Sequence, residues 1–559
     1  TIQACLDGAA PGSTVVISAG TYITSLTLSK AVSLTGVSSA TVILQALTNR
    51  RVLTVTSAVT TNVVISGLTF ANGHAVGGAC PAGCGGGLFI DSGTHPLLTN
   101  LILLSNTAGA AGGGVFASSF ITLTNVQFIS NTAAGDGGGL DGGAALLING
   151  GLFRGNQCTG IGCGGGGAYA TSNVVLTGTQ FLSNTSTSDG GGLNGQIVVI
   201  FDGGLFRSNQ CTDINCRGGG LSALNTILLT DTQFLTNTSK SLGGGAYAQA
   251  AILSGGLFQA NQCLNVGLNC RGGGLYSSGS IKLTGTVFLS NTASADGGGA
   301  HAQSVATLVN GRFEKNQCLF TICNGGGLLA LNTLTLTGTE FVCNTAQETG
   351  GGVFANATTK LNGGLFQGNQ CQAAGCTGGG LTAETNLALT GTRFLSNTAA
   401  GAGGALRHNS LVGRMVNALF AGNNAGSGAG ALSLNSSGPV TVLYTTIDHG
   451  AGAAIEQAQG SLVITDSIIT SYTIGISNTG GFVKEGNNLY FANGTNLLGA
   501  STNTGPDVTG ADPLYRSPAA GNYHLRNDSP AKNIGVDVGV ATDIDGDARP
   551  AGGGFDAGF

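Results

Sequence analysis

The sequence predicts an all-β protein, a right-handed parallel β-helix of about 17 coils of 25–28 residues each. The first observation is a repeat of roughly 53 residues that comprises two coils. A fixed period of this length is typical of stacked arrays, in which each unit buries its apolar face against its neighbours. The repeat is marked by "NQC" tripeptides, which end at Cys158, Cys211, Cys263, Cys318 and Cys371.

Two further observations favour strands. Each coil holds short runs with apolar residues at alternating positions, such as Ile227 and Leu229, and no stretch keeps a helical period for long. The 100 glycines among 559 residues would destabilise any set of long helices, and the missing Gly-X-Y period excludes collagen.

Residues 1–60 are expected to hold a short capping helix and the first coils. Ile2, Cys5, Leu6 and Ala9 are spaced as one apolar face of a helix. Because the end of a β-helix exposes unpaired strand groups, we expect this helix to cover the N-terminal end of the core.

Residues 61–432 are expected to form the regular repeats, with three strands in each coil. Asparagine, three residues after each phenylalanine, is interpreted as a turn residue with left-handed backbone, and the "GGG" runs as corners that only glycine fits. The phenylalanines fall in register and predict an inward aromatic stack. They are Phe153, Phe181, Phe206, Phe234, Phe258, Phe288, Phe313, Phe341, Phe366 and Phe394.

The cysteines predict small disulfide-closed loops. Equivalent cysteines lie two coils apart, about 9.6 Å, which exceeds the roughly 7 Å limit for a bridge. Zinc is the alternative, but each pair would need two more ligands and no histidine lies in register. Persistent disulfides indicate a secreted or cell-surface protein. The expected pairs are Cys80/Cys84, Cys158/Cys163, Cys211/Cys216, Cys263/Cys270, Cys318/Cys323 and Cys371/Cys376.

Cys5 and Cys343 remain outside these pairs. Cys343 replaces serine in "FVCN", two residues after Phe341, and is expected to face the core. Buried, inert thiols are the simplest interpretation of both, with a reactive or intermolecular thiol as the alternative.

The repeat loosens towards the C-terminus. Residues 433–499 are expected to form the last, irregular coils, and residues 500–559 a capping or docking segment. The latter contains Pro506, Pro513, Pro518 and Pro530 together with many of the acidic residues.

Charge and hydropathy exclude several partners. Only 8% of the residues are charged and the net charge is −5, with no basic stripe for nucleic acid or an anionic membrane. No run of 18 apolar residues predicts a transmembrane helix. Self-association, other surface proteins or glycans are the expected partners.

Candidate catalytic residues form no convincing cluster. Asp136, Asp189 and Asp296 each precede a "GGG" corner, but Leu242 interrupts their column. Glycoside hydrolases need paired carboxylates, so these aspartates are interpreted as solvated turn residues and the protein as not an enzyme.

The other polar residues that recur from coil to coil do not form a convincing catalytic or binding site either. Arg154 and Arg207 occupy equivalent positions that continue as Gln259, Glu314 and Gln367, whereas Arg217 and Arg271 are expected to cap carbonyls or face solvent. The histidines share no column. They are His74, His95, His301, His408, His449 and His524.

One short motif could bind a metal ion. Asp543, Asp545 and Asp547 in "DIDGD" alternate around a glycine, a pattern that can chelate calcium through oxygen ligands. The usual distal glutamate is missing, so a plain acidic turn is the alternative. No other cofactor is expected.

Three motifs carry family resemblances. Tandem "FLSN" with "GGGL", "GGGA" and "GGGV" over roughly residues 86–425 resembles the repeats of chlamydial polymorphic outer-membrane proteins. "TIQACLDGAAPGSTVVISAGTY" resembles the opening of pectin-lyase-like β-helix proteins. The segment from "NYHLRNDSPAKN" to "GGGFDAG" resembles the terminal module of bacterial surface proteins with variable anchors. These resemblances imply a right-handed β-helix displayed outside the cell.

The functional expectation is a non-catalytic extracellular structural or adhesive protein that self-assembles into a filament or surface layer. One alternative is a monomeric carbohydrate-binding adhesin. The other is a polysaccharide lyase or glycoside hydrolase, because the same fold hosts such enzymes.

Overall fold

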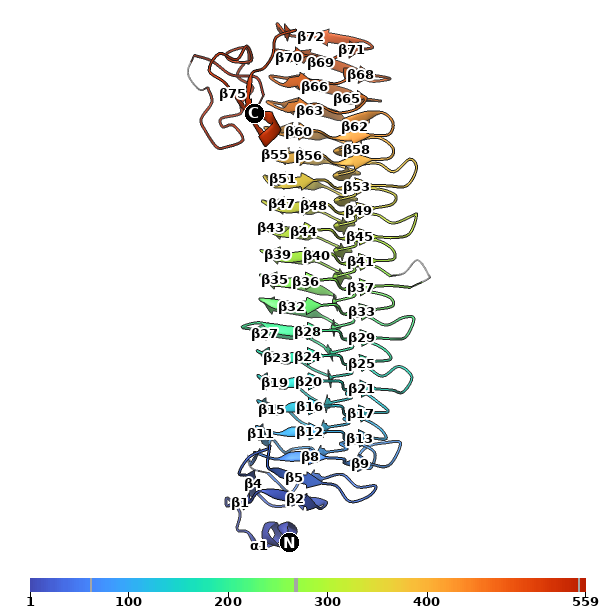
Figure 1. Ribbon diagram of the computed structural model, residues 1–559, viewed down its shortest axis with the longest axis vertical. Coiled ribbons are helices and arrows are strands. Elements are labelled where there is room, and N and C mark those ends of the chain that lie inside the picture. Colours follow the sequence, from blue (N-terminus) through green and yellow to red (C-terminus); the bar gives the residue numbers. More distant parts are fainter. Residues whose placement is uncertain (61–62, 266–269, 551–552, 559) are drawn as a thin grey trace. The chain divides into compact units, whose positions relative to one another are not determined.

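The computed structural model describes residues 1–60, 63–265, 270–550 and 553–558. The chain forms two compact units, Thr1–Ser278 and Gly279–Phe559, and each is a parallel β-solenoid (Figure 1). The expected boundary at residue 61 lies outside the described residues.

The described residues make about 19 turns, two more than the expected 17. The difference arises because coils near the C-terminus are shorter than 25 residues. β66 (Ser461–Thr465) and β69 (Phe482–Gly486) are adjacent in one sheet and begin 21 residues apart.

A regular coil of the first unit contains four strands, not three. β15 (Ile121–Thr124), β16 (Gln127–Ile129), β17 (Thr132–Ala133) and β18 (Leu140–Gly142) follow one another around the solenoid. Each pairs in parallel with its counterpart one coil later. In β15 the inward Ile121 and Leu123 are buried, and the alternating threonines are half-buried on the outer face. The two-residue strand β17 is too short to show this alternation, so periodicity did not predict it.

The second unit repeats this plan. β47 (Leu334–Thr337), β48 (Glu340–Val342), β49 (Thr345–Ala346) and β50 (Val353–Ala355) pair with the next coil. That coil consists of β51 (Thr359–Asn362), β52 (Leu365–Gln367), β53 (Gln370–Cys371) and β54 (Leu381–Ala383).

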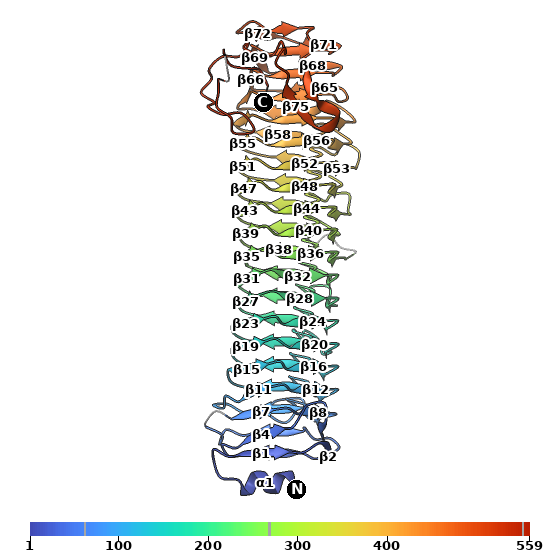
Figure 2. The same cartoon turned by 60° about the vertical axis from the view of Figure 1, so that its left-hand side comes forward.

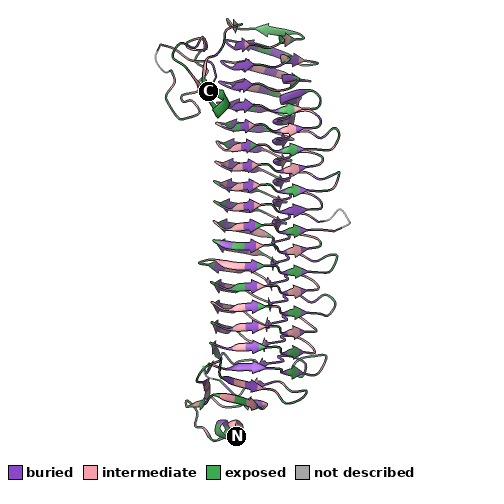
Figure 3. Ribbon diagram, viewed as in Figure 1, coloured by how far each residue is buried: buried purple, intermediate pink, exposed green. Residues whose placement is uncertain are grey.

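An aromatic stack fills the core of each unit, as predicted. Ring centroids from Phe128 to Phe258 lie 4.5–4.9 Å apart, and those from Phe288 to Phe420 lie 4.5–5.0 Å apart. These side chains are fully buried, and Figure 3 shows buried residues along the strands of the regular coils. Stacking in offset geometry adds to the burial energy of each ring.

The N-terminal helix α1 (Ile2–Gly8) packs on β1 (Thr14–Ile17) and β3 (Leu26–Leu28). Its cap is Thr1, whose side chain accepts from the Ala4 N–H. Leu6 is buried but Cys5 is exposed, so the expectation of a buried Cys5 thiol is wrong. The short helix presents a single buried side chain to the solenoid.

The solenoid of the second unit ends with β71 (Thr495–Leu498), β72 (Ser501–Asn503) and β73 (Val508–Thr509). The chain then turns back along the outer face of the sheet that contains β60 (Leu419–Ala421), β64 (Thr446–Asp448) and β67 (Ile468–Thr470) (Figures 1 and 2). This returning segment, which we call the tail (residues 511–558), includes the antiparallel pair β74 (Tyr515–Ser517) and β75 (Asn522–Leu525).

Apolar contacts and polar bonds hold the tail in place. Tyr523 packs with Leu419, and Ala557 packs with Ile468. The Arg549 guanidinium lies 3.8 Å from the centroid of the Tyr444 ring, a cation–π contact. The tail therefore docks on the side of the solenoid.

Candidate functional site

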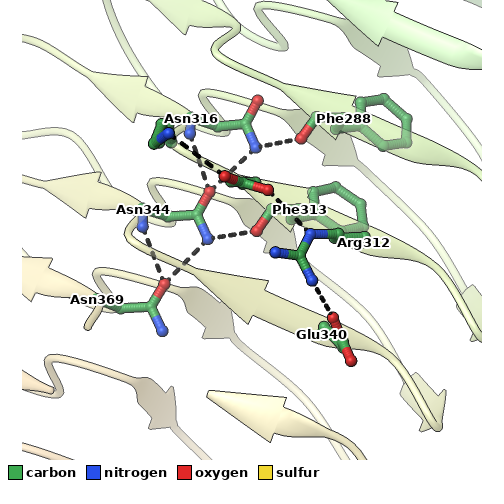
Figure 4. Close-up of polar contacts among 9 residues, drawn as sticks. Phe288, Arg312, Phe313, Asn316, Glu340, Asn344 and Asn369 are labelled. Atoms are coloured by element: carbon green, nitrogen blue, oxygen red, sulfur yellow. Dashed lines mark hydrogen bonds and ion pairs between the residues drawn. The ribbon is translucent and has the colours of Figure 1, made fainter. Parts of the chain in front are cut away.

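A ladder of buried asparagines is the dominant polar feature of both units. The Asn344 Oδ1 accepts from the backbone N–H and from Nδ2 of Asn316, each at 3.0 Å, and the Asn344 Nδ2 donates to the Asn369 Oδ1 at 2.9 Å (Figure 4). The Asn344 Nδ2 also donates to the Phe313 carbonyl at 2.8 Å. The ladder in the first unit comprises Asn106, Asn131, Asn156, Asn184, Asn209, Asn237 and Asn261, and that in the second unit comprises Asn291, Asn316, Asn344, Asn369, Asn397 and Asn423.

The expected role of these asparagines is wrong. The residue before the asparagine has left-handed backbone, for example Ser130 (φ 55°) and Thr236 (φ 55°), whereas Asn131 and Asn237 are fully buried. This turn directs the amide inward, where burial requires that its hydrogen bonds be made. Cys343 occupies the same left-handed position (φ 54°) and is exposed, which corrects the expectation that it faces the core.

Six disulfides close loops that follow the short strands in the coils. Their Cα–Cα distances are between 5.1 and 6.0 Å, within the normal range. The loop between Cys263 and Cys270 includes residues outside the described part. The bonds are Cys80–Cys84, Cys158–Cys163, Cys211–Cys216, Cys263–Cys270, Cys318–Cys323 and Cys371–Cys376.

The corner aspartates link adjacent coils and are not solvated turn residues. Asp136 accepts from the Gly164 N–H at 2.7 Å and Asp296 accepts from the Asn324 N–H at 3.0 Å. Asp189 accepts from the Arg217 N–H at 2.9 Å and from its guanidinium, so Arg217 neither caps a carbonyl nor simply faces solvent. Each carboxylate therefore satisfies a peptide group of the next coil.

Asp141 is a buried carboxyl that the sequence analysis missed. It lies on β18 with only 6% of its surface exposed, in register with Tyr169 on β22 (Ala168–Ala170). Burial, with a smaller contribution from the negative charge of Asp136, raises the pKa of Asp141 to about 8. Burial also raises the pKa of Tyr169. No sequence signal distinguishes Asp141 from a solvated residue, because the neighbouring coils bury it.

The column of polar residues that follows the phenylalanines is mainly exposed. Arg154, Arg207, Gln259 and Gln367 face solvent. Glu314 lies 2.9 Å from the Arg312 Nε, and the hydrogen bond from Arg312 holds the pKa of Glu314 below its usual value.

His449 has a carboxylate partner beside the tail. The His449 Nδ1 lies 2.8 Å from Asp448 Oδ2, and Thr470 Oγ1 donates to the other carboxylate oxygen at 2.5 Å. Asp448 is buried beneath the tail, beside Tyr523. This arrangement fixes the histidine ring next to the docked tail.

The "DIDGD" segment is a turn closed by its own first aspartate. The Asp543 Oδ1 accepts from the N–H groups of Asp545 and Asp547, each at 2.9 Å. The Asp545 carboxylate faces His524 at 3.4 Å and Arg393 at 3.9 Å. Among the described residues no three histidine, cysteine or acidic side chains gather as metal ligands. These contacts favour the acidic turn over calcium, and the calcium site stays a prediction.

A groove of about 410 Å³ lies between this turn and the solenoid. Its polar groups are Glu340 and Arg393, and its apolar groups are Leu365, Leu395 and Ile544. The rest of its wall has no side chains, because it consists of Gly338, Gly363, Gly364 and Gly391.

No known protein-family model matches this chain, and no curated protein resembles it in sequence. The resemblances to pectin-lyase-like and polymorphic outer-membrane proteins therefore remain expectations from short motifs. Within the described ranges, no helix is both long and apolar enough to cross a membrane.

Proposed function

We propose that this protein is an extracellular, non-catalytic structural or adhesive β-solenoid that associates with copies of itself. The observation that carries the proposal is the continuous interior of each unit, where an asparagine ladder and a phenylalanine stack run from coil to coil. Such an interior resists deformation, since every coil satisfies buried polar groups of its neighbour.

The disulfides and the charge support this proposal. Six disulfides in one chain are typical of proteins that work in an oxidising environment. With 8% charged residues and a net charge of −5, copies can approach one another with little electrostatic repulsion.

The environment of Asp141 argues against a glycoside hydrolase. Asp136 and Asp141 are one pair of carboxyl groups whose charges interact, and a raised pKa would suit a general acid. However, Asp141 is only 6% exposed, so a glycan would not reach its carboxyl. We therefore interpret this pair as part of the coil packing.

Electron microscopy of the purified native protein, combined with light scattering over a wide concentration range, tests the proposal. We expect ordered assemblies, and loss of order when reductant opens the disulfides. Particles that stay monomeric at every concentration would contradict self-association.

A carbohydrate-binding adhesin is the second candidate, and the groove beside Arg393 favours it. A carboxylate, a guanidinium and apolar side chains around a glycine wall offer both hydrogen bonds and a surface for the C–H face of a sugar ring. Glycan-array binding that is lost in Arg393→Ala but kept in Arg414→Ala, an exposed arginine on β59 (Gly413–Val416), would support this function.

A further inference from the structure

At the N-terminal end of the first unit, the helix α1 covers part of the edge of β3. The Gln3 Nε2 donates to the Thr27 carbonyl at 3.0 Å, and the Thr27 N–H donates to the Gln3 Oε1 at 2.9 Å. The Gln3 carboxamide thus makes the two hydrogen bonds to Thr27 of β3 that a neighbouring strand would otherwise make. Covering an edge in this way prevents it from pairing with another chain.

The C-terminal end of the second unit has an unprotected strand. β72 pairs with β69 on one side and has no second partner among the described strands. All three of its residues, Ser501, Thr502 and Asn503, are exposed. The strand is short, with three residues, but it contains no lysine, charged residue or proline, which are among the usual means of blocking an edge.

The tail leaves this strand uncovered. Its apolar residues contact the side of the solenoid, where Ala531 and Ala557 pack against Ile468 and Leu489. Beside β72, Leu498 on β71 has 51% of its surface exposed. Figure 1 shows β71 and β72 at one end of the second unit, with the tail beside the preceding coils.

We propose that β72 is the surface through which two copies of this chain associate, with their β72 strands antiparallel across a two-fold axis. A two-fold contact uses the same patch on both copies, and an extended strand is the partner that satisfies a row of free peptide groups. The inference rests on the self-association in the proposed function and specifies it. Because a two-fold contact is closed, it joins two chains, and a larger ordered assembly needs a second contact.

Cross-linking at the centre of β72 tests the pairing. In a two-fold pair centred on Thr502, the two copies of this residue face each other. Directly opposed Cβ atoms lie about 4.5–5.5 Å apart, close to the separation that a disulfide needs. Thr502→Cys is made in a background with Cys5→Ser and Cys343→Ser, which removes the exposed thiols. The control is Thr390→Cys, at an exposed position on β55 (Leu387–Thr390), a strand that has neighbours on both sides.

Under mild oxidation we expect Thr502→Cys to form a reducible dimer at least ten-fold faster than Thr390→Cys. We also expect Ser501→Lys to weaken association by at least ten-fold in sedimentation equilibrium, with an unchanged circular dichroism spectrum. If the protein associates but Thr502→Cys cross-links no faster than Thr390→Cys, the contact lies elsewhere and the inference is wrong. If the unmodified protein is monomeric at every concentration, the self-association of the proposed function fails as well.

Discussion

Replacing one asparagine of the ladder by alanine removes only a few atoms but should destabilise the solenoid strongly. Asn344 is fully buried in the second unit and its side chain takes part in four hydrogen bonds. Asn344→Ala removes all of them, and the backbone N–H of Asn316 then lacks an acceptor in an interior closed to water.

The expected cost follows from these bonds. A hydrogen bond contributes about 1 kcal/mol net, and a buried donor left unsatisfied costs about 1–3 kcal/mol. Three lost bonds at about 1 kcal/mol each, together with the orphaned Asn316 N–H at about 1–3 kcal/mol, therefore predict a loss of about 4–6 kcal/mol in the free energy of unfolding near this coil.

Hydrogen exchange measured by mass spectrometry suits this prediction because solenoids open locally. Exchange should accelerate by about a thousand-fold to ten-thousand-fold in β48 and β49, since each 1.4 kcal/mol is a factor of ten. The control is Asn332→Ala, at an exposed residue whose Oδ1 accepts only from neighbouring Thr333. If Asn344→Ala accelerates exchange no more than Asn332→Ala, the ladder does not stabilise the fold and our reasoning is refuted.

Three further predictions concern titration, thiols and disulfides. Because burial raises the pKa of Asp141 from 3.8 to about 8, the folded state binds its proton more tightly, and stability should fall as pH rises from 4 to 8. Asp141→Asn should make the melting temperature less dependent on pH in this range; an unchanged profile would contradict the assignment. The exposed Cys5 and Cys343 should both react with a maleimide in the folded protein, and mass spectrometry should count two adducts before denaturation. Replacing both Cys318 and Cys323 by alanine should cost on the order of 2 kcal/mol and make that loop sensitive to limited proteolysis, whereas equal protease resistance would argue against it.

The architecture could be predicted because it depends on local, repeated patterns. The regular spacing of Phe153, Phe181 and Phe206 places one ring in each coil, so stacking follows from the repeat itself. The cysteine pairs are likewise close in sequence.

Other features depend on contacts that the local sequence does not encode. Asparagine suits both a left-handed turn and a buried amide, and only the coil geometry shows that Ser130 takes the turn while Asn131 points inward. Asp141 is buried by the neighbouring coils. The position of the tail could not be predicted, because the surface on which it docks is far away in the sequence. For example, the Asn417 Nδ2 donates to the Thr542 carbonyl.

The asparagine ladder has a direction. In each rung the amide oxygen accepts from the preceding coil, so the backbone N–H of Asn316 and one of its two Nδ2 hydrogen bonds require Asn344. A partly formed solenoid that grows from its N-terminus therefore always ends in a buried amide that requires an acceptor, and the next coil supplies it. At Asn423 this requirement ends, because its Nδ2 donates to the Ala421 carbonyl within its own coil. Each added coil thus satisfies the donors that the previous coil exposes, and this templating stops at Asn423.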